Sequence, residues 1–351
     1  MSIADNTPAS SARRPTIKDV AALAGVSIKT VSRVINGESR VTEETAAKVH
    51  QATRALRYLP DAAAAALSRS SHETRTIALL IASVGNPFSS AVFQGVEEVA
   101  TARHFAVFAA STEGNPETEE RLVRAFLSRN VDGLIITPTA VDHRAIAELI
   151  GPNLPNVYVD RDPLGIAADV ITANNREAAR LAVEHLIAHG HHRIAAMTDQ
   201  LSVSTAVDRR AGYIDALIAA DIPLRDEYMI ADIGSETDGF VAMEGLLALP
   251  HPPTALFASR NMAAIGAIRV LQREHLEHQI ALIGMDDIDT GDLFNPPLSV
   301  MRQDPVQIGR LAAERLFARI DNDTSLPQQI IVPAELVARG SGEIRHKHGR
   351  S

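Results

Sequence analysis

Residues 16–37, TIKDVAALAGVSIKTVSRVING, contain two short helical patterns separated by a glycine turn. Thr16 is followed three positions later by an aspartate, which is the spacing of a capping box. Gly25 ends the first pattern, because glycine readily adopts the left-handed conformation that closes a helix. Ser27 can cap a second helix over residues 28–36. This arrangement is the helix-turn-helix pattern, in which the second helix enters the major groove of DNA.

The expected second helix has one apolar face and one polar face. At about 100° per residue, Val31 and Val34 fall on one side, and Lys29 and Arg33 fall on the other. Basic side chains suit guanine edges and phosphates. A helix face that is only solvated has the same pattern, so the helix alone leaves both interpretations open.

The charges are unevenly distributed along the chain. The net charge is −9 over 351 residues, yet residues 1–70 hold ten Lys and Arg against six Asp and Glu. The other 281 residues hold 24 Lys and Arg against 37 Asp and Glu, so a head of +4 precedes a body of −13. Such a head suits nucleic acid. On this count alone, chance clustering is the alternative.

Composition excludes several classes of protein. A hydrophobic content of 46% supplies a large core, which excludes a disordered or fibrous chain. The chain has no cysteine and therefore no disulfide framework or thiolate metal site. No apolar stretch has the length of a signal peptide or a membrane span. We therefore expect a cytoplasmic protein that does not enter a membrane.

From Thr76 onward, short apolar runs alternate with amphipathic helical segments. The runs include TIALLIAS, FAVFAAS, GLIITPT, NVYVD, RIAAMTD, ALFAS and IALIGMD. Strands that are apolar on both sides and joined by helices indicate parallel sheets covered on both faces. Nine or so strands suit two similar α/β lobes, with a ligand cleft between them at the carboxyl ends of the strands.

The segment between head and body, residues 61–75, reads DAAAAALSRSSHETR. Its alanines favour a helix, but Leu67 is its one large apolar residue, so the helix has little to bury. It could fold on contact with DNA and insert Leu67 as a wedge in the minor groove. An ordinary linker is the alternative.

These motifs together resemble the lac repressor family of bacterial transcription regulators along nearly the whole chain. The resemblance rests on residues 16–37, SRVTEETAAKV, YLPDAAAAALSRS, GNPF, NVDGLIITP, HLIAHGHHRIA, DRRAGY, LIGMDD and VPAELVARGS. It implies a helix-turn-helix head with a hinge helix, followed by a periplasmic-binding-protein-like body of two Rossmann-like lobes. The chain would cross between the lobes near Thr172, Arg302 and Ile330. It also implies a homodimer that binds a pseudo-palindromic operator under the control of an effector and represses carbohydrate genes.

The expected organisation is a flexible tail (1–14), a helix-turn-helix domain (15–59), a hinge helix and linker (60–75), a body (76–340) and a second flexible tail (341–351). Within the body, the first lobe would comprise about residues 76–172 and 302–330, and the second lobe about residues 173–301 and 331–340.

By resemblance, base edges would be read by Ile28, Lys29 and Arg33. Contacts to the DNA backbone would come from Thr16, Ser27, Thr30, Ser32, Asn36 and Arg40. Leu67 matches the hinge leucine that opens the central base step. The hinge departs from the family at Asp61 and Ala65, where asparagine and arginine are usual. The missing cation weakens its expected minor-groove contact.

The resemblance also places eight side chains in the effector cleft: Phe88, Ser89, Asp160, Thr205, Arg209, Arg260, Asn261 and Asp286. Arg209 would hold ligand hydroxyls or a carboxylate, and Asp286 would accept from hydroxyls. Arg260 departs from the asparagine–aspartate pair of many members. Two guanidinium groups favour an anion, such as a sugar acid or a sugar phosphate. If Arg260 instead pairs with Asp286 or Asp287, the cleft suits a neutral sugar.

The sequence gives weaker support to other functions. His185 and His189 have a spacing that can bind metal, but no metalloprotease motif accompanies them, and we expect no metal site. No nucleophile elbow, phosphate loop or dinucleotide motif follows a strand, so we expect neither an enzyme nor a cofactor. A sugar-binding transport protein would share the body but lack the basic head. An activator remains open, because the sign of regulation depends on where the operator lies.

Overall fold

The computed structural model describes residues 15–35, 41–58, 74–139 and 142–346. The chain divides into two compact units, with the boundary in the sequence between Thr74 and Arg75. The expected N-terminal tail, Asn36, Arg40 and most of the hinge segment, including Leu67, lie outside the described residues.

The first unit contains α1 (Ile17–Ala24), α2 (Ile28–Ile35) and α3 (Glu43–Leu56). The expected caps are confirmed. The Thr16 backbone N–H donates to the Asp19 carboxylate at 2.7 Å, and the Thr30 N–H donates to Ser27 Oγ at 3.1 Å. Gly25 has a φ of 67°, the left-handed conformation that ends α1.

The three helices enclose one small core. The fully buried side chains are Val20, Val31 and Val49, one from each helix, and Val34 is 8% exposed. The apolar face expected for α2 is therefore its inner face, and its polar face points away from this core.

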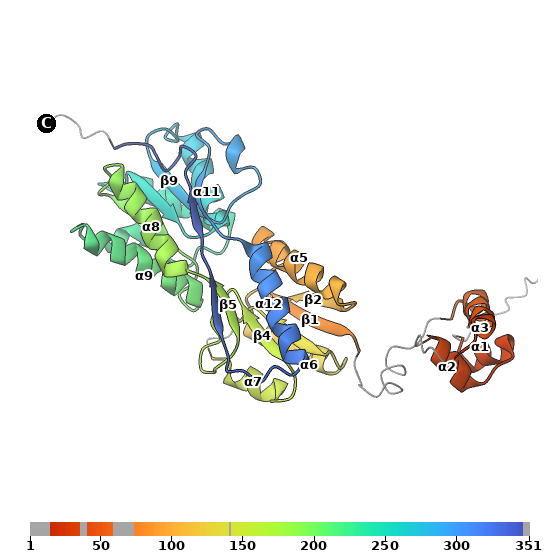
Figure 1. Cartoon of the computed structure of the whole chain (residues 1–351). Helices are drawn as coiled ribbons and strands as arrows, with labels where there is room; N and C mark the ends of the chain where they lie inside the picture. The colour runs from red at the N-terminus through yellow and green to blue at the C-terminus, as the bar shows by residue number, and fades with distance from the viewer. Residues whose placement is uncertain (1–14, 36–40, 59–73, 140–141, 347–351) are drawn as a thin grey trace, which may run out of the picture. The chain divides into compact units, whose positions relative to one another are not determined.

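The second unit contains two six-stranded sheets, seen one above the other in Figure 1. The first sheet has the order β11-β5-β4-β3-β1-β2, and the second has the order β12-β10-β9-β8-β6-β7. The strands of the first sheet are β1 (Thr76–Ile81), β2 (Ala106–Ser111), β3 (Gly133–Ile136), β4 (Asn156–Val159), β5 (Val170–Ala173) and β11 (Gln329–Val332). Those of the second are β6 (Ile194–Met197), β7 (Met229–Ile230), β8 (Ala255–Ala258), β9 (Ala281–Met285), β10 (Ser299–Arg302) and β12 (Glu335–Val337).

Helices cover both faces of each sheet, as expected for buried parallel strands. The first lobe has α5 (Pro87–Ala102) and α12 (Pro305–Ile320) on one face, and α6 (Pro116–Leu127) and α7 (Arg144–Ile150) on the other. The second lobe has α8 (Asn175–Ala188) and α9 (Ser204–Ala219) opposite α10 (Glu236–Leu247) and α11 (Asn261–Arg273). Two short 3-10 helices, η1 (Asp226–Tyr228) and η2 (Gly291–Leu293), complete it.

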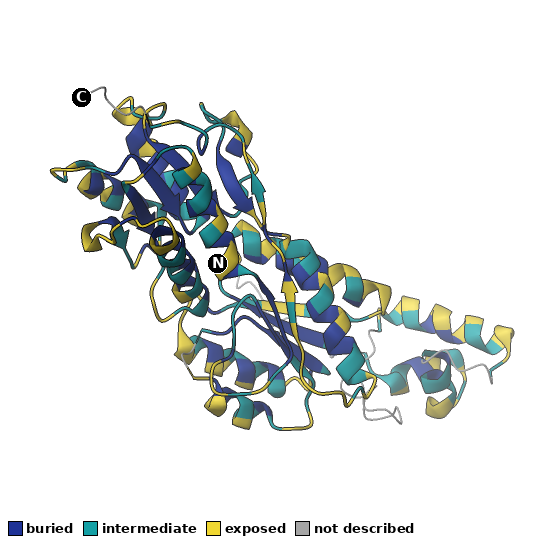
Figure 2. Cartoon of the chain, turned by 60° about the vertical axis from the view of Figure 1, so that its left-hand side comes forward, coloured by how far each residue is buried: buried dark blue, intermediate teal, exposed yellow. Residues whose placement is uncertain are grey.

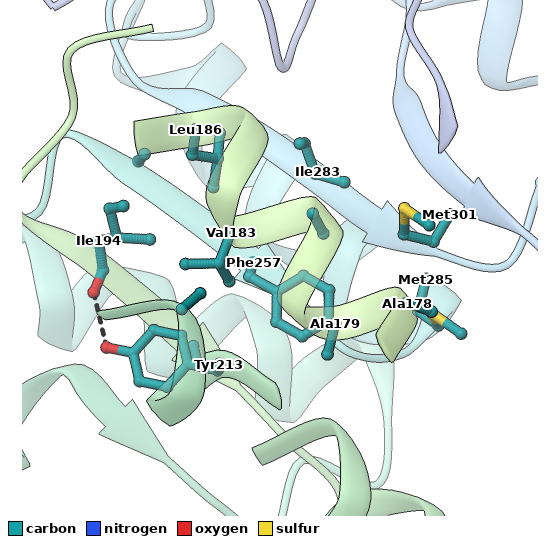
Figure 3. Close-up of a cluster of buried hydrophobic side chains, with 14 of the residues drawn as sticks. Ala178, Ala179, Val183, Leu186, Ile194, Tyr213, Phe257, Ile283, Met285 and Met301 are labelled. Carbon is teal, nitrogen blue, oxygen red and sulfur yellow. Dashed lines mark hydrogen bonds between the residues drawn. The ribbon is translucent and has the colours of Figure 1, made fainter. Parts of the chain in front are cut away.

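Buried strands and half-exposed helices give each lobe its own core (Figure 2). In the second lobe, Phe257 of β8 belongs to the cluster that α8 and α9 form with the sheet (Figure 3). Tyr213 of α9 is 1% exposed, and its hydroxyl donates to the Ile194 carbonyl at 2.8 Å. A buried polar atom is thus satisfied within the core.

The third crossing between the lobes lies close to Ile330, where it was expected. Val332 still pairs with Ala173 in the first sheet, so the crossing follows residue 332. The chain then forms β12, which pairs with β10 in the second sheet. This pair is antiparallel, whereas the other strand pairs of the second sheet are parallel.

The expectation of a flexible tail from residue 341 was wrong for residues 341–346. Ser341 is 7% exposed, and its hydroxyl donates to the Leu282 carbonyl at 2.6 Å. The Leu282 N–H donates in return to the Ser341 carbonyl at 2.9 Å. Glu343 accepts from Ser299 Oγ at 2.7 Å. Polar composition suggested a solvated tail, but these groups bond to the edge of the second lobe instead.

Candidate functional site

The outer face of α2 gathers the side chains predicted to meet DNA. Ile28 is 46% exposed although it is apolar, and Lys29 is exposed beside it. Ser32 and Arg33 are half-buried on the same helix. An exposed isoleucine flanked by a lysine gives this face both an apolar and a cationic contact group, which suits base edges.

The hydroxyls near the helix starts are engaged in capping. Ser27 Oγ and Thr30 Oγ1 lie 2.9 Å apart, and Thr16 Oγ1 donates to the Asp19 carboxylate at 2.7 Å. Ser27 therefore caps the start of α2. Ser27, Ile28 and Lys29 are exposed, so the N-terminus of α2 is open to solvent. Its partial positive charge there suits a phosphate.

A second candidate site lies between the two lobes of the body. A cavity of about 40 Å³ opens there, at the carboxyl ends of strands from both sheets. Its lining comprises Asn86, Phe88, Asp160, Arg161, Asp199, Thr205, Ala206, Arg209, Ser259, Arg260, Asn261, Asp286 and Gln303. Seven of the eight predicted cleft residues are brought together here, and Ser89, which is 6% exposed in α5, does not line the cavity.

Six lining residues were not predicted: Asn86, Arg161, Asp199, Ala206, Ser259 and Gln303. Three of these residues could have been found in the sequence. Arg161 and Ser259 are next to predicted cleft residues, and Asp199 ends an apolar run that predicts a strand. Gln303 follows β10, a short strand that the apolar pattern did not reveal.

Arg209 lies at the centre of the cavity's polar network. It is 7% exposed, its Nε donates to Asn175 Oδ1 at 2.8 Å, and its Nη1 donates to the Ser259 carbonyl at 2.7 Å. These bonds hold the guanidinium in one orientation. Its positive charge acts on Asp286, which lies in the same lining.

Asp286 follows β9 with a φ of 67° and accepts from Gln303 Nε2 at 2.5 Å. Protein encloses most of its carboxylate, and this burial raises the pKa of Asp286, against the opposing effect of Arg209. A left-handed backbone and a carboxylate with a raised pKa both cost stability, and such features cluster at functional sites.

Arg260 forms an ion pair with Asp199, which is neither Asp286 nor Asp287, the two partners considered from the sequence. Its Nη1 donates to Asp199 Oδ2 at 2.7 Å, whereas Asp287 pairs with Arg339 at 2.6 Å. The third arginine of the lining, Arg161, lies 3.5 Å from the Asp160 carboxylate. The lining therefore contains three arginines and three aspartates, and these formal charges cancel.

Several polar atoms of the lining have no hydrogen-bond partner among the described residues. Ser259 Oγ and Gln303 Oε1 are both buried without one, and Arg161 Nε makes only the 3.5 Å ion-pair contact with Asp160. Unsatisfied buried polar groups are costly and rare. Their concentration around one cavity indicates a site built to exchange hydrogen bonds with a ligand.

The histidines considered for metal binding have other contacts. His185 Nε2 lies 2.6 Å from Glu343, and His189 Nδ1 lies 2.8 Å from the His185 carbonyl. Among the described residues, no group of three His, Cys, Asp or Glu could hold a metal ion. Nor is any helix in the described part of the chain both long and apolar enough to cross a membrane.

Comparison with known proteins identifies both units. Residues 16–61 match the family described as bacterial regulatory proteins, lacI family, and residues 183–342 match the periplasmic binding protein-like domain. The ribose operon repressor of Escherichia coli K12 is 35% identical over 330 residues, which cover 93% of this chain and 99% of that repressor. The chain belongs to the lacI family.

Other members agree with this assignment. The transcriptional repressor PurR of Mannheimia succiniciproducens is 31% identical over 93% of this chain and 98% of its own length. A crystal structure of the lac repressor dimer, bound to operator and the anti-inducer ONPF, matches with a TM-score of 0.83 and 28% identity. The match covers 94% of this chain and 99% of the lac repressor chain. This lacI-family protein is a DNA-binding transcriptional repressor with an effector-binding domain, and it is not an enzyme.

Proposed function

We propose that the effector of this repressor is a small neutral molecule rich in hydroxyl groups, such as a monosaccharide, and that it binds between the lobes. The observation that carries this proposal is the pair of buried atoms at the cavity that have no hydrogen-bond partner among the described residues: the Ser259 hydroxyl and the Gln303 amide oxygen. Sugar hydroxyls both donate and accept, so one ligand can satisfy both.

The charges of the lining favour a neutral ligand over an anion. Arg260 is neutralised by Asp199, and Asp160 lies beside Arg161. Arg209 already donates two hydrogen bonds to protein atoms and acts electrostatically on Asp286. A sugar acid or sugar phosphate would therefore bring uncompensated negative charge into a partly desolvated site.

The size of the cavity suggests how binding controls the repressor. About 40 Å³ holds little more than one water molecule, whereas ligand pockets usually measure about 300–1,000 Å³. A neighbouring hollow of about 260 Å³ shares Asp160 and Thr205 with it. Because these residues come from different lobes, a sugar enters only if the lobes move relative to one another. Effector binding and lobe arrangement are then coupled.

Titration calorimetry on the purified repressor tests the effector class. Ribose and glucose represent neutral sugars, and ribose 5-phosphate and glucose 6-phosphate are their matched anions. We expect a neutral sugar to bind and its phosphate ester to bind much more weakly or not at all. Binding of phosphate esters alone would contradict the proposal. Because one relative is named as a ribose operon repressor, ribose is the first neutral sugar to test.

For DNA binding, we propose a homodimer that binds a pseudo-palindromic operator near genes of carbohydrate uptake or catabolism. Within each head, Ile28, Lys29 and Arg33 would read base edges. The backbone would be contacted by Thr16, Ser27, Thr30, Ser32, Asn36 and Arg40, and Leu67 would act as the minor-groove wedge. Support comes from the exposed outer face of α2 and from the dimeric lac repressor structure that this chain resembles.

Operator selection from random DNA, together with light scattering, tests this second part. A selected site with two inverted halves and a particle of twice the chain mass are the expected results. A single unsymmetrical site bound by a monomer would contradict the dimer. A stable tetramer would contradict it as well.

A further inference from the structure

The ion pair of Asp199 and Arg260 is built into the wall of the effector cavity. Asp199 follows β6 and Arg260 follows β8, two strands that are hydrogen-bonded neighbours in the second sheet. Arg260 Nη1 lies 2.7 Å from Asp199 Oδ2. Both side chains line the cavity, with exposed fractions of 24% for Arg260 and 17% for Asp199. The arginine is thus held by its neighbour while it still borders the ligand space.

The surroundings of Arg260 would otherwise attract an anion. Arg260 is the residue at the N-terminal cap of α11, a helix of 13 residues whose dipole places partial positive charge there. Ser259, directly before it, is 1% exposed, and its Oγ has no hydrogen-bond partner among the described residues. Arg209 lies in the same lining. A cation, a helix start and a buried hydroxyl donor in one wall are the usual parts of a phosphate site.

We propose that Asp199 sets the charge specificity of this cleft: it occupies Arg260 and so hides an anion site formed by Arg260, Ser259 and the start of α11. The proposal deepens the proposed function, because it names the residue that makes the effector neutral. A phosphate ester has to compete with the Asp199 carboxylate for the same guanidinium. Without that carboxylate, the one remaining hydrogen bond of Arg260 among the described residues is that from Nη1 to the Ile233 carbonyl at 3.5 Å. The guanidinium can then bind phosphate, and the net charge of the lining rises by one.

Inorganic phosphate is the probe, since it requires no knowledge of the effector. The full-length repressor is titrated with phosphate at constant ionic strength, as wild type, as Asp199→Asn and as the double variant Asp199→Asn/Arg260→Gln. We expect Asp199→Asn to bind phosphate about tenfold more tightly than wild type. The double variant should return to the wild-type affinity. Added chloride should weaken the gained binding, because part of it is electrostatic.

A matched pair elsewhere in the same lobe supplies the control. Asp287 and Arg339 are 2.6 Å apart and 28% and 22% exposed, but they do not line the cavity. Asp287→Asn should leave phosphate affinity unchanged. If Asp287→Asn gained as much phosphate affinity as Asp199→Asn, the gain would reflect only the loss of a negative charge from the protein, and the proposal would be wrong. Equal phosphate affinity of wild type and Asp199→Asn would also overturn it.

Two further measurements keep the outcome clear. Thermal unfolding verifies that Asp199→Asn is folded, and if it is not, Asp199→Ser serves as the second variant. Binding of neutral sugars to wild type is measured separately. If no sugar binds, the proposed effector class fails, but the phosphate comparison still decides whether Asp199 hides an anion site.

Discussion

Glu119 and His143 are both fully buried in the first lobe, and their side chains meet at 3.2 Å between Oε1 and Nε2. The other oxygen of Glu119 accepts the Thr139 N–H at 3.0 Å. Pro138, the residue before Thr139, accepts Arg161 Nη1 at 3.2 Å through its carbonyl. The buried pair therefore anchors the loop that holds an arginine of the effector cavity.

Replacing Glu119 tests this pair. We expect Glu119→Gln to reduce the free energy of unfolding by about 1–3 kcal/mol at pH 7, because the amide cannot accept from both His143 and Thr139 and leaves a buried polar group unsatisfied. Urea unfolding measures the change. The control is Glu120→Gln, one residue along α6, where Glu120 and its partner Arg124 are 50% and 61% exposed. That substitution should cost less than about 0.5 kcal/mol. Similar costs for both would contradict a special role for the buried pair.

Acid should reduce the difference between wild type and Glu119→Gln. Burial by itself raises the pKa of Glu119, but the bonds from His143 and Thr139 outweigh it and lower this pKa below its ordinary value of 4.5. The ionised carboxylate therefore stabilises the fold fully above pH 4.5. This contribution is lost as the pH falls through the lowered pKa. Unfolding curves from pH 7 to pH 3 check the trend, and a difference that grows in acid would contradict it.

Glycine contacts between helices predict a second stability effect. A Cβ on Gly95 of α5 would lie 2.1 Å from the Val306 carbonyl oxygen of α12, in direct conflict with backbone. Gly95→Ala should therefore force the helices apart and cost about 2 kcal/mol or more. Gly245→Ala in α10 is the matched control, because its Cβ would meet nothing within 4 Å. It should stabilise by about 0.5–1 kcal/mol. Melting temperatures distinguish the two, and equal shifts would contradict the close-packing account.

The sequence predicted best what is decided locally. The capping residues Thr16 and Ser27 and the turn at Gly25 were predictable because each acts on residues a few positions away. Most strands were visible as apolar runs. The last three strands, β10, β11 and β12, were missed, because their neighbours in the two sheets decide their structure.

The residues that line the candidate cleft were largely predictable, but the ion pairs between them were not. Resemblance brought most of its residues together, but it left open whether Arg260 binds an anion or pairs with Asp286 or Asp287, and the residue that pairs with it is Asp199. Asp199 lies 61 residues earlier in the chain, and the two meet because β6 and β8 are adjacent. Strand order is a tertiary property, so the charge balance of the cavity could not be derived from composition.

The buried carboxylate of Asp286 should lower the stability of the folded protein at neutral pH. Its pKa is raised by burial, so the folded state disfavours the ionised form, and this cost develops as the pH rises from 3.8 through the raised pKa. Asp286→Asn should therefore melt roughly 2–4 °C higher than wild type at pH 7. The gain should vanish near pH 3.8. The exposed Asp289→Asn is the control and should change little. Loss of stability in Asp286→Asn at pH 7 would contradict the expected cost.

Arg33 on α2 is expected to distinguish one DNA sequence from another. Arg33→Ala should weaken binding to the selected operator by about 1–3 kcal/mol and relax the preference at one base pair, because a bidentate contact to guanine is lost. Lys48→Ala is the control: Lys48 lies on α3 and pairs with Glu44 at 2.8 Å. Affinities for operator and random DNA are compared at one salt concentration. Equal losses on both DNAs for Arg33→Ala would mean that Arg33 contacts phosphate and does not read a base.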